Sequence, residues 1–364
     1  IKIILPVGIS FYTFQTLSYS IDVYKKKLEP THDFIAFSAF VSFFPQLVAG
    51  PIERAVHLLP QFYNKRTFDY ANAVDGLRQI LWGLFKKVVI ADNAAQIVND
   101  VFTYYDQYPS STLIMGAIFF SLQIYCDFSG YSDIAIGTSR LFGFDLMQNF
   151  NFPYFSRDIA EFWRRWHISL STWFRDYLYI PLGGSKGGIV MKVRNTCIIF
   201  LVSGFWHGAN WTFIAWGAIN ALLFLPLLIR NRNRTFTDTV AHGRILPSLK
   251  EVFQLSLTFV LVTFGWIFFR SDTISDALVY IARIVTQEFW VVPHTNLSGD
   301  FVIHVFAAVF FFVYIEWVGR GGKFALEKLG LSWSKLARRS LYILVCLFIF
   351  LFFGKDQAFI YFQF

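Results

Sequence analysis

Residues 197–229 read CIIFLVSGFWHGANWTFIAWGAINALLFLPLLI, an apolar run of 33 residues that holds a single ionisable side chain, His207. A transmembrane helix needs about 20 predominantly apolar residues. The run is too long for one upright span, so we expect it to tilt strongly or to break near Gly204, Gly208 or Gly217. Because an ionisable group at membrane depth is costly, His207 is the first candidate for a functional residue.

The rest of the chain has the same apolar character. Of its 364 residues, 55% are hydrophobic and 15% are charged, and the mean hydropathy is +0.47, whereas soluble domains carry about 25% charged residues. The other candidate spans are 1–21, 34–51, 77–98, 112–143, 252–269, 274–292, 301–318 and 337–354. The stretch 34–51 contains two prolines and is expected to be short or re-entrant, and 274–292 carries three charges and is the weakest span. We predict an all-α fold: a polytopic transmembrane helical bundle with re-entrant and interfacial helices, forming a single membrane domain over residues 1–364.

Two expectations about organisation come from the start of the chain and from its longest polar connection. Ile1 opens an apolar segment without a basic n-region or a cleavage site, so the segment does not resemble a signal peptide. We expect the chain to be a fragment whose earlier, N-terminal spans are missing. The polar loop 230–250 is the best candidate for a hinge between two halves.

Charge and cysteine content exclude several classes of site. The net charge of +8 gathers in the connections between apolar segments, which is typical of the positive-inside bias of membrane proteins. No base-reading motif accompanies it, so nucleic acid is not an expected partner. Cys126, Cys197 and Cys346 lie far apart in apolar stretches, so neither a disulfide nor a metal site is predicted.

The region 154–180 contains a helical pattern with one aromatic face and one polar face. The apolar face comprises Ile159, Phe162, Trp163, Trp166, Leu170, Trp173, Phe174 and Tyr177. We expect an amphipathic helix at the membrane interface. Arg164 and Arg165 on its polar face could bind phosphate groups of a donor. Alternatively, Glu161 pairs with Arg165 at i,i+4 and the face is simply solvated.

Two polar residues lie close to His207 in the sequence of the apolar run. On a continuous helix Ser203, His207 and Asn210 would share one face. A neutral imidazole in a low-dielectric pocket can take a proton from a hydroxyl. The alternative is a core histidine bonded to a neighbouring helix. A second histidine, His167, shares the polar face of the amphipathic helix, and its proximity to His207 is a prediction.

A third polar group interrupts the span 112–143. Its sequence CDFSGYSD (126–133) puts Asp127 and Asp133 about two helical turns apart. They could line a hydrophilic cavity or hold an arginine, and we favour a structural ion pair as their single role.

These motifs together resemble the membrane-bound O-acyltransferase (MBOAT) family. The motifs are DFSGYSD (127–133), FWRRWHISLSTW (162–173) and FWHGAN (205–210), in that order. PVGISFY (6–12), VAGPI (48–52) and RDYLYIPLGG (175–184) resemble its alginate O-acetyltransferase branch. The resemblance covers about residues 1–225, and beyond them it rests on the hydrophobic pattern.

The resemblance implies a fold and a mechanism. The bundle would be pierced by a funnel, with an acyl donor on the cytoplasmic side and an acceptor on the outer side. His207 would be the catalytic general base, with His167 orienting or assisting it and Asn210 and Ser203 stabilising the developing oxyanion. The donor would be acetyl-CoA, used as a substrate, with no bound cofactor.

The same resemblance implies surroundings and partners. We expect a multi-pass protein of the bacterial inner membrane, in contact with membrane lipid, a periplasmic acetyltransferase partner and a polysaccharide acceptor. D-alanyl transfer to teichoic acid, or acylation of a lipid, are alternatives within the family. A transporter that passes acyl groups or glycans without catalysis, or a structural scaffold, are alternatives outside it.

Overall fold

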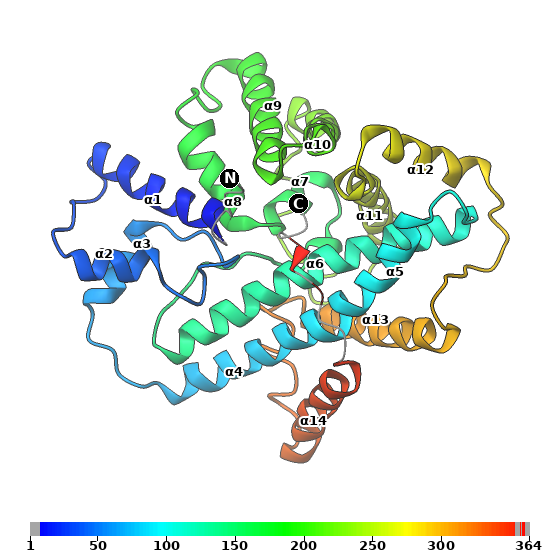
Figure 1. Cartoon of the computed structure of the whole chain (residues 1–364). Helices are drawn as coiled ribbons and strands as arrows, with labels where there is room; N and C mark the ends of the chain where they lie inside the picture. The colour runs from blue at the N-terminus through cyan, green and yellow to red at the C-terminus, as the bar shows by residue number, and fades with distance from the viewer. Residues whose placement is uncertain (1–7, 354–356, 358, 361–364) are drawn as a thin grey trace, which may run out of the picture.

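The computed structural model describes residues 8–353, 357, 359 and 360, and every regular element in that part is helical (Figure 1). This confirms the all-α prediction. Five of the helices are long and apolar enough to cross a membrane: α6 (Ser110–Leu141), α9 (Gly188–His207), α10 (Trp211–Ile229), α11 (Leu249–Arg270) and α13 (Gly299–Gly319). The other α-helices are α1 (Ile9–Tyr24), α2 (Phe34–Val41), α3 (Ala55–Tyr63), α4 (Tyr70–Leu84), α5 (Asp92–Thr103), α7 (Ile159–Arg165), α8 (Ile168–Phe174), α12 (Ile274–Thr286) and α14 (Lys335–Phe352). Three short elements, η1 (Phe85–Ala91), η2 (Pro153–Phe155) and η3 (Arg175–Tyr179), are π or 3₁₀ helices.

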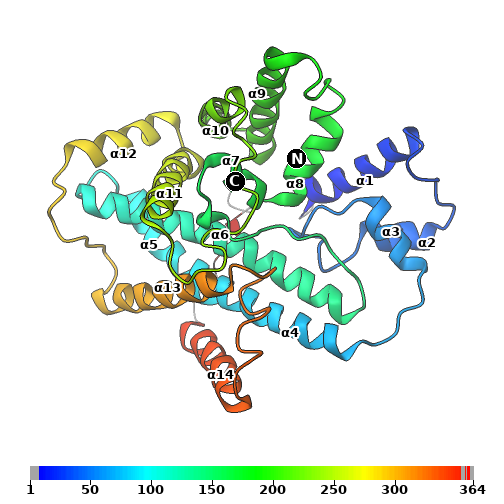
Figure 2. The same cartoon turned by 180° about the vertical axis from the view of Figure 1, so that it is seen from behind.

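The long helix α6 lies beside α4 through the middle of the molecule, and both views show the pair (Figures 1 and 2). Two glycine pairs allow the close approach. A Cβ added to Gly76 would lie 2.7 Å from the carbonyl oxygen of Gly137, and one added to Gly83 would lie 2.6 Å from that of Gly130. Small residues of this kind let helix backbones approach closely inside a membrane.

The apolar run 197–229 forms two helices, α9 and α10, that break at Gly208, as the length of the run predicts. The helices pack back to back through Gly204 and Gly217. A Cβ added to Gly204 would lie 2.3 Å from the carbonyl oxygen of Phe213, and one added to Gly217 would lie 2.4 Å from that of Phe200. The break therefore folds the run into a hairpin whose tip carries His207.

Several other expected spans differ in length. The stretch 274–292 contains α12, which has only 13 residues and is too short to cross a membrane. The stretch 34–51 contains the 8-residue α2, so it is short, as its prolines indicate. The stretch 77–98 lies inside one helical run of α4, η1 and α5. Of the first expected span, residues 1–7 lie outside the described part.

The single amphipathic helix expected within 154–180 is wrong as a continuous element. The chain forms α7, α8 and η3, and between α7 and α8 His167 adopts the left-handed conformation, with φ 44° and ψ 55°. The periodicity of apolar residues continues across the kink, so the sequence pattern did not reveal it. The Glu161–Arg165 pair exists, with 2.8 Å between Oε1 and Nη2.

The polar connection between α10 and α11 is held to the bundle by arginines. Arg157 forms an ion pair with Asp238 at 2.9 Å. Arg320 donates to the carbonyl oxygens of Val240, Ala241 and Arg244. The connection therefore contacts both the segment before α7 and the end of α13.

A buried carboxylate joins α3 to the segment that follows α6. Glu53 is fully buried and accepts hydrogen bonds from the backbone N–H of Met147 and from Nδ1 of His57, the latter at 2.7 Å. Nε2 of His57 lies 3.6 Å from Asp145. Hydrogen bonds to Asp145 and then to Glu53 raise the pKa of His57 from 6.5 to about 10.

We predict that replacing Gly204 with Val destabilises the α9–α10 hairpin by about 1–3 kcal/mol, because the new side chain overlaps the backbone of α10. Thermal unfolding of the detergent-solubilised protein measures this. Gly299→Ala is the matched control, since nothing lies within 4 Å of a Cβ at that position. Equal unfolding temperatures for both variants would contradict the packing.

We predict that the contribution of His57 to stability depends on pH. Because its folded pKa is raised, the contribution is complete below about pH 6.5 and is lost as the pH rises to about 10. The difference in unfolding temperature between wild type and His57→Gln should therefore shrink across that range. His242→Gln, at an exposed site, is the control. A constant difference from pH 6 to pH 10 would exclude this role.

Candidate active site

The kink at His167 is built by the segment that precedes η2. The backbone N–H of Ile168 donates to the carbonyl oxygen of Asn149 at 2.8 Å, and that of Asn151 donates to the carbonyl oxygen of Arg165 at 2.9 Å. These bonds hold the two sides of the left-handed residue. As a result the His167 side chain turns into the protein, where it is 2% exposed, instead of sharing a polar face with Arg164 and Ser171 as the helical pattern predicts.

Aromatic rings surround His167. The centroid of its ring lies 4.6 Å from that of Phe128, 6.0 Å from Trp206, 6.4 Å from Phe150 and 6.5 Å from Phe11. Burial, together with the neighbouring His207, lowers the pKa of His167 well below its usual value of 6.5. The ring is therefore neutral at physiological pH.

His207 ends α9 and is half-buried. Its ring lies 4.8 Å from that of Trp206 and 5.2 Å from the rings of Trp216 and Phe269. Trp206 contacts both histidines. The predicted proximity of His167 and His207 is borne out by this shared neighbour and by the cavity that both residues line.

The cavity has a volume of about 650 Å³ and lies between the kinked segment and the α9–α10 hairpin. His167, His207 and Ser203 line it together. A volume of this size is typical of small-molecule sites. The sequence-predicted group of two histidines and one serine hydroxyl is therefore assembled in one place.

Four cationic residues also line this cavity: Arg164, Arg175, Lys192 and Arg234. Arg164 donates to the carbonyl oxygens of Asn233 and Phe236, and Arg175 pairs with Asp176 at 2.7 Å. Within the described residues, Lys192 and Arg234 form no ion pair. The cavity thus combines an aromatic interior with positive charge.

Two of the predicted site residues lie elsewhere. Asn210 follows the break at Gly208, which changes the helical phase, so it does not share a face with Ser203 and His207. Its side chain caps α10 by accepting from the N–H of Thr212 at 3.1 Å and donates to the carbonyl oxygen of Asp272 at 2.8 Å. It lines a second cavity of about 390 Å³, with Thr212, Phe269 and Asp272 among the other lining residues.

Arg165 is the other displaced residue. It is buried, and its guanidinium group binds Glu161 and the carbonyl oxygens of Asn151 and Asp238. It is not among the residues that line the large cavity. Its role in the structure is to hold the kinked segment against the α10–α11 connection.

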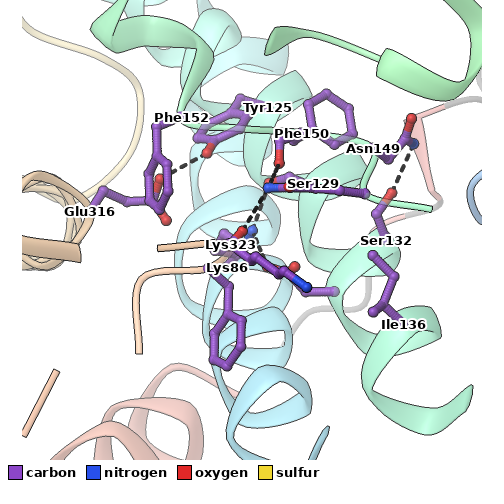
Figure 3. A pocket seen from close by; sticks show the side chains of 13 residues that line it. Lys86, Tyr125, Ser129, Ser132, Ile136, Asn149, Phe150, Phe152, Glu316 and Lys323 are labelled. Carbon is purple, nitrogen blue, oxygen red and sulfur yellow. Dashed lines mark hydrogen bonds and ion pairs between the residues drawn. The ribbon is translucent and has the colours of Figure 1, made fainter. Parts of the chain in front are cut away.

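Asp127 and Asp133 are both engaged in ion pairs on α6. Asp127 pairs with Lys87 at 2.8 Å, and Asp133 pairs with Lys86 and accepts from Gln79 at 2.8 Å. The cations are lysines of η1 rather than an arginine. Asp133 also lines a cavity of about 10 Å³, close to the space that one water molecule needs, together with residues that include Lys86, Ser132 and Glu316 (Figure 3).

Several residues of the site belong to no sequence pattern from which their place in the site could be predicted. Lys192 and Arg234 belong to segments whose charges are typical of membrane-protein connections. Trp163, expected only as part of an apolar face, lines the cavity with an indole N–H that has no hydrogen-bond partner among the described residues. Asn149 lies in an irregular segment, where no periodicity distinguishes one polar residue from another.

Comparison with known proteins gives consistent matches. The sequence model of the membrane-bound O-acyltransferase family matches residues 24–267. A probable alginate O-acetylase of Pseudomonas aeruginosa is 41% identical over 318 residues, which cover 87% of this chain and 58% of the relative. A peptidoglycan O-acetyltransferase of Helicobacter pylori is 32% identical over 410 residues, covering 100% of this chain and 75% of the relative. A teichoic acid D-alanyltransferase of Bacillus subtilis is 29% identical over 279 residues, with 72% of this chain and 68% of the relative covered.

The alginate O-acetylase relatives agree with the branch that the sequence motifs indicate. The chain spans 51 to 58% of the length of three of them. The family match covers well over half of the chain, and its apolar helices are those of a multi-pass membrane protein. The chain belongs to the membrane-bound O-acyltransferase family.

Proposed function

We propose that the protein is an O-acyltransferase of the bacterial inner membrane that moves an acetyl group from a cytoplasmic thioester to a hydroxyl of an alginate-like exopolysaccharide outside. The observation that carries this proposal is the cavity shared by His167, His207 and Ser203. The names of the alginate O-acetylase relatives support the choice of group and acceptor.

The proposed reaction needs one base and one stabiliser of negative charge. His207 takes the proton of the acceptor hydroxyl as its oxygen attacks the thioester carbonyl carbon. The carbonyl oxygen becomes an oxyanion, for which the Ser203 hydroxyl and the Trp163 indole N–H are donors on the cavity wall. When the tetrahedral intermediate collapses, the carbon–sulfur bond breaks, and the thiolate takes the proton from the His207 imidazolium. The products are an O-acetyl ester and a free thiol.

The donor in this proposal is acetyl-CoA, which carries phosphate groups at the end remote from the thioester. Arg164, Arg175, Lys192 and Arg234 supply positive charge in the same cavity as the histidines. Guanidinium and ammonium groups bind phosphate through charge-assisted hydrogen bonds. The apolar and aromatic lining leaves room for the thioester arm to reach His207.

We place the acceptor on the other side of the α9–α10 break. Phe269 contacts His207 and also lines the second cavity, which has polar residues at Asn210, Thr212 and Asp272. Side chains of this kind suit the hydroxyl groups of a sugar. A periplasmic acetyltransferase and the lipid around the bundle are the proposed partners.

Other members of the family suggest alternative acyl groups and acceptors for this protein. Relatives named peptidoglycan O-acetyltransferase and teichoic acid D-alanyltransferase differ in the acyl group or the acceptor that their names state. Transfer assays should therefore include alginate, peptidoglycan and teichoic acid as acceptors. A transporter without catalysis would move acyl groups or glycans without depending on His207.

We predict that His207→Ala lowers acetyl transfer by at least about 100-fold, because general-base catalysis contributes on that scale. The assay quantifies O-acetyl groups on the secreted polysaccharide of cells that express the full-length protein, with membrane levels determined by blotting. His242→Ala, at an exposed position, is the matched control. Normal acetylation by His207→Ala at normal membrane level would rule out the base and favour transport or a scaffold.

We predict that Lys192→Ala and Arg234→Ala each raise KM for acetyl-CoA about tenfold and change kcat little, because each loses a charged contact to phosphate worth about 1.5 kcal/mol or more. Initial rates with purified full-length protein at several salt concentrations measure this, and the effect should weaken at high salt. Lys250→Ala, on an exposed lysine outside the cavity lining, is the control. An unchanged KM in both variants would exclude this part of the cavity as the donor site.

A further inference from the structure

Asn149 is fully buried and lies outside any helix, yet its side chain takes part in four hydrogen bonds. Its Oδ1 lies 3.0 Å from Nδ1 of His167 and 2.9 Å from Oγ of Ser169. Its Nδ2 donates to Oγ of Ser132 on α6 at 3.0 Å (Figure 3). The backbone of Asn149 also accepts from Ile168 in the kink. One residue thus touches the kink, α6 and the ring of His167.

The orientation of the Asn149 amide follows from Ser169. The backbone N–H of Ile52 donates to Oγ of Ser169 at 3.0 Å, and the N–H of Ser169 points to the Asn149 side chain at 3.4 Å. Because the N–H of Ser169 can only donate, the atom of Asn149 that faces it is Oδ1 and not the amide nitrogen, and the Ser169 hydroxyl donates to the same oxygen. The amide nitrogen then faces Ser132, where it acts as a donor.

This orientation determines the tautomer of His167. An oxygen that faces Nδ1 can only accept, so Nδ1 of the neutral ring carries the hydrogen. Nε2 then bears the lone pair, and within the described residues it has no hydrogen-bond partner. His167 lines the large cavity, so its one remaining polar atom is an acceptor that is available to a bound molecule.

We propose that Asn149 is a positioning residue that holds His167 in the Nδ1–H tautomer, so that Nε2 accepts a hydrogen bond from a second hydroxyl of the acceptor sugar while the attacking hydroxyl donates to His207. This inference rests on the proposed acyl transfer. It assigns a separate role to each histidine, because His207 removes the proton of the attacking hydroxyl and His167 holds the acceptor through its neighbouring hydroxyl. Asn149 itself does not touch the substrate.

The anchor of Asn149 on α6 lies next to a buried ion pair. Ser132 is buried beside Asp133, whose carboxylate pairs with Lys86, and Lys86 also donates to Ser129 at 3.0 Å. In Figure 3, Asn149 and Ser132 lie together at the right, and Lys86 lies close to Ser129 near the centre. The charged cluster of α6 and η1 therefore supports the amide that orients His167. Residues that position a reactive group in this way affect activity without contacting the reactants.

Protonation of His167 would destroy this arrangement, so the pH dependence of the reaction tests it. The titratable group that faces His167 is His207 on α9. From α1, α6 and the segment after α6, the rings of Phe11, Phe128 and Phe150 face it. A charge introduced at Asn149 would therefore act on His167 with little competition from other charged groups.

The experiment compares kcat against pH for wild type, Asn149→Ala and Asn149→Asp in the purified full-length protein. Asn149→Ala should lower kcat about 10- to 100-fold and leave KM for acetyl-CoA unchanged. Asn149→Asp keeps an acceptor for Nδ1–H and should retain more activity. Its carboxylate stabilises the imidazolium, so the acid limb of its kcat profile should move to higher pH by about one unit or more.

Asn151→Ala is the matched control, because the hydrogen bonds of Asn151 in the described part are made by its backbone. Wild-type kcat per folded molecule in Asn149→Ala, or an acid limb in Asn149→Asp that does not move, would overturn the inference while leaving His207-dependent transfer intact. Absence of transfer by the wild-type protein, or full activity of His207→Ala, would overturn the proposed function as well.

Discussion

The left-handed backbone conformation at His167 determines where the chemistry of this protein is located. A residue with a side chain adopts this conformation at a cost of about 1–2 kcal/mol. Here two backbone hydrogen bonds, one that Asn149 accepts from Ile168 and one that Asn151 donates to Arg165, offset that cost. A straight helix would leave His167 beside Arg164 on a polar face. The kink turns the imidazole into the aromatic interior and leaves Arg164 on the same cavity as a cation.

The membrane setting explains how the other polar groups are arranged. A buried charge is costly unless it is paired and hydrogen-bonded. Asp127 and Asp133 meet this condition through the lysines of η1, and Arg165 meets it through Glu161. Lys192 and Arg234, which form no ion pair within the described residues, lie on the cavity instead. The absence of an ion pair in the described part of the chain is one reason why we propose these two residues for donor binding.

Much of the fold could be predicted from the sequence because hydrophobic length and period determine membrane helices. The break in 197–229 followed from its length, and His207 followed from its isolation in an apolar run. The position of Asn210 could not be predicted, because a break of even one residue at Gly208 changes the direction of every side chain after it. The inward turn of His167 was hidden because a left-handed residue leaves the spacing of apolar residues unchanged.

Asn149 shows a second reason why the sequence alone does not identify every residue of the site. Its importance comes from contacts to residues 17 to 20 positions away, and no local pattern encodes such contacts. Arg165 was misassigned for the same reason: its buried partners include the carbonyl oxygen of Asp238, 73 positions away. Motif and period therefore identified the histidines, whereas the residues that orient them required three-dimensional contacts.

The central claim is that His167 and His207 lie in one cavity that receives the donor. Chemical modification of histidine with diethyl pyrocarbonate, read at each residue by mass spectrometry, tests it most directly, with and without a coenzyme A analogue that lacks the thiol. The account predicts that the analogue slows modification of both His167 and His207 and leaves the exposed His242 unaffected. Modification of the two histidines at the same rate with and without the analogue would contradict it.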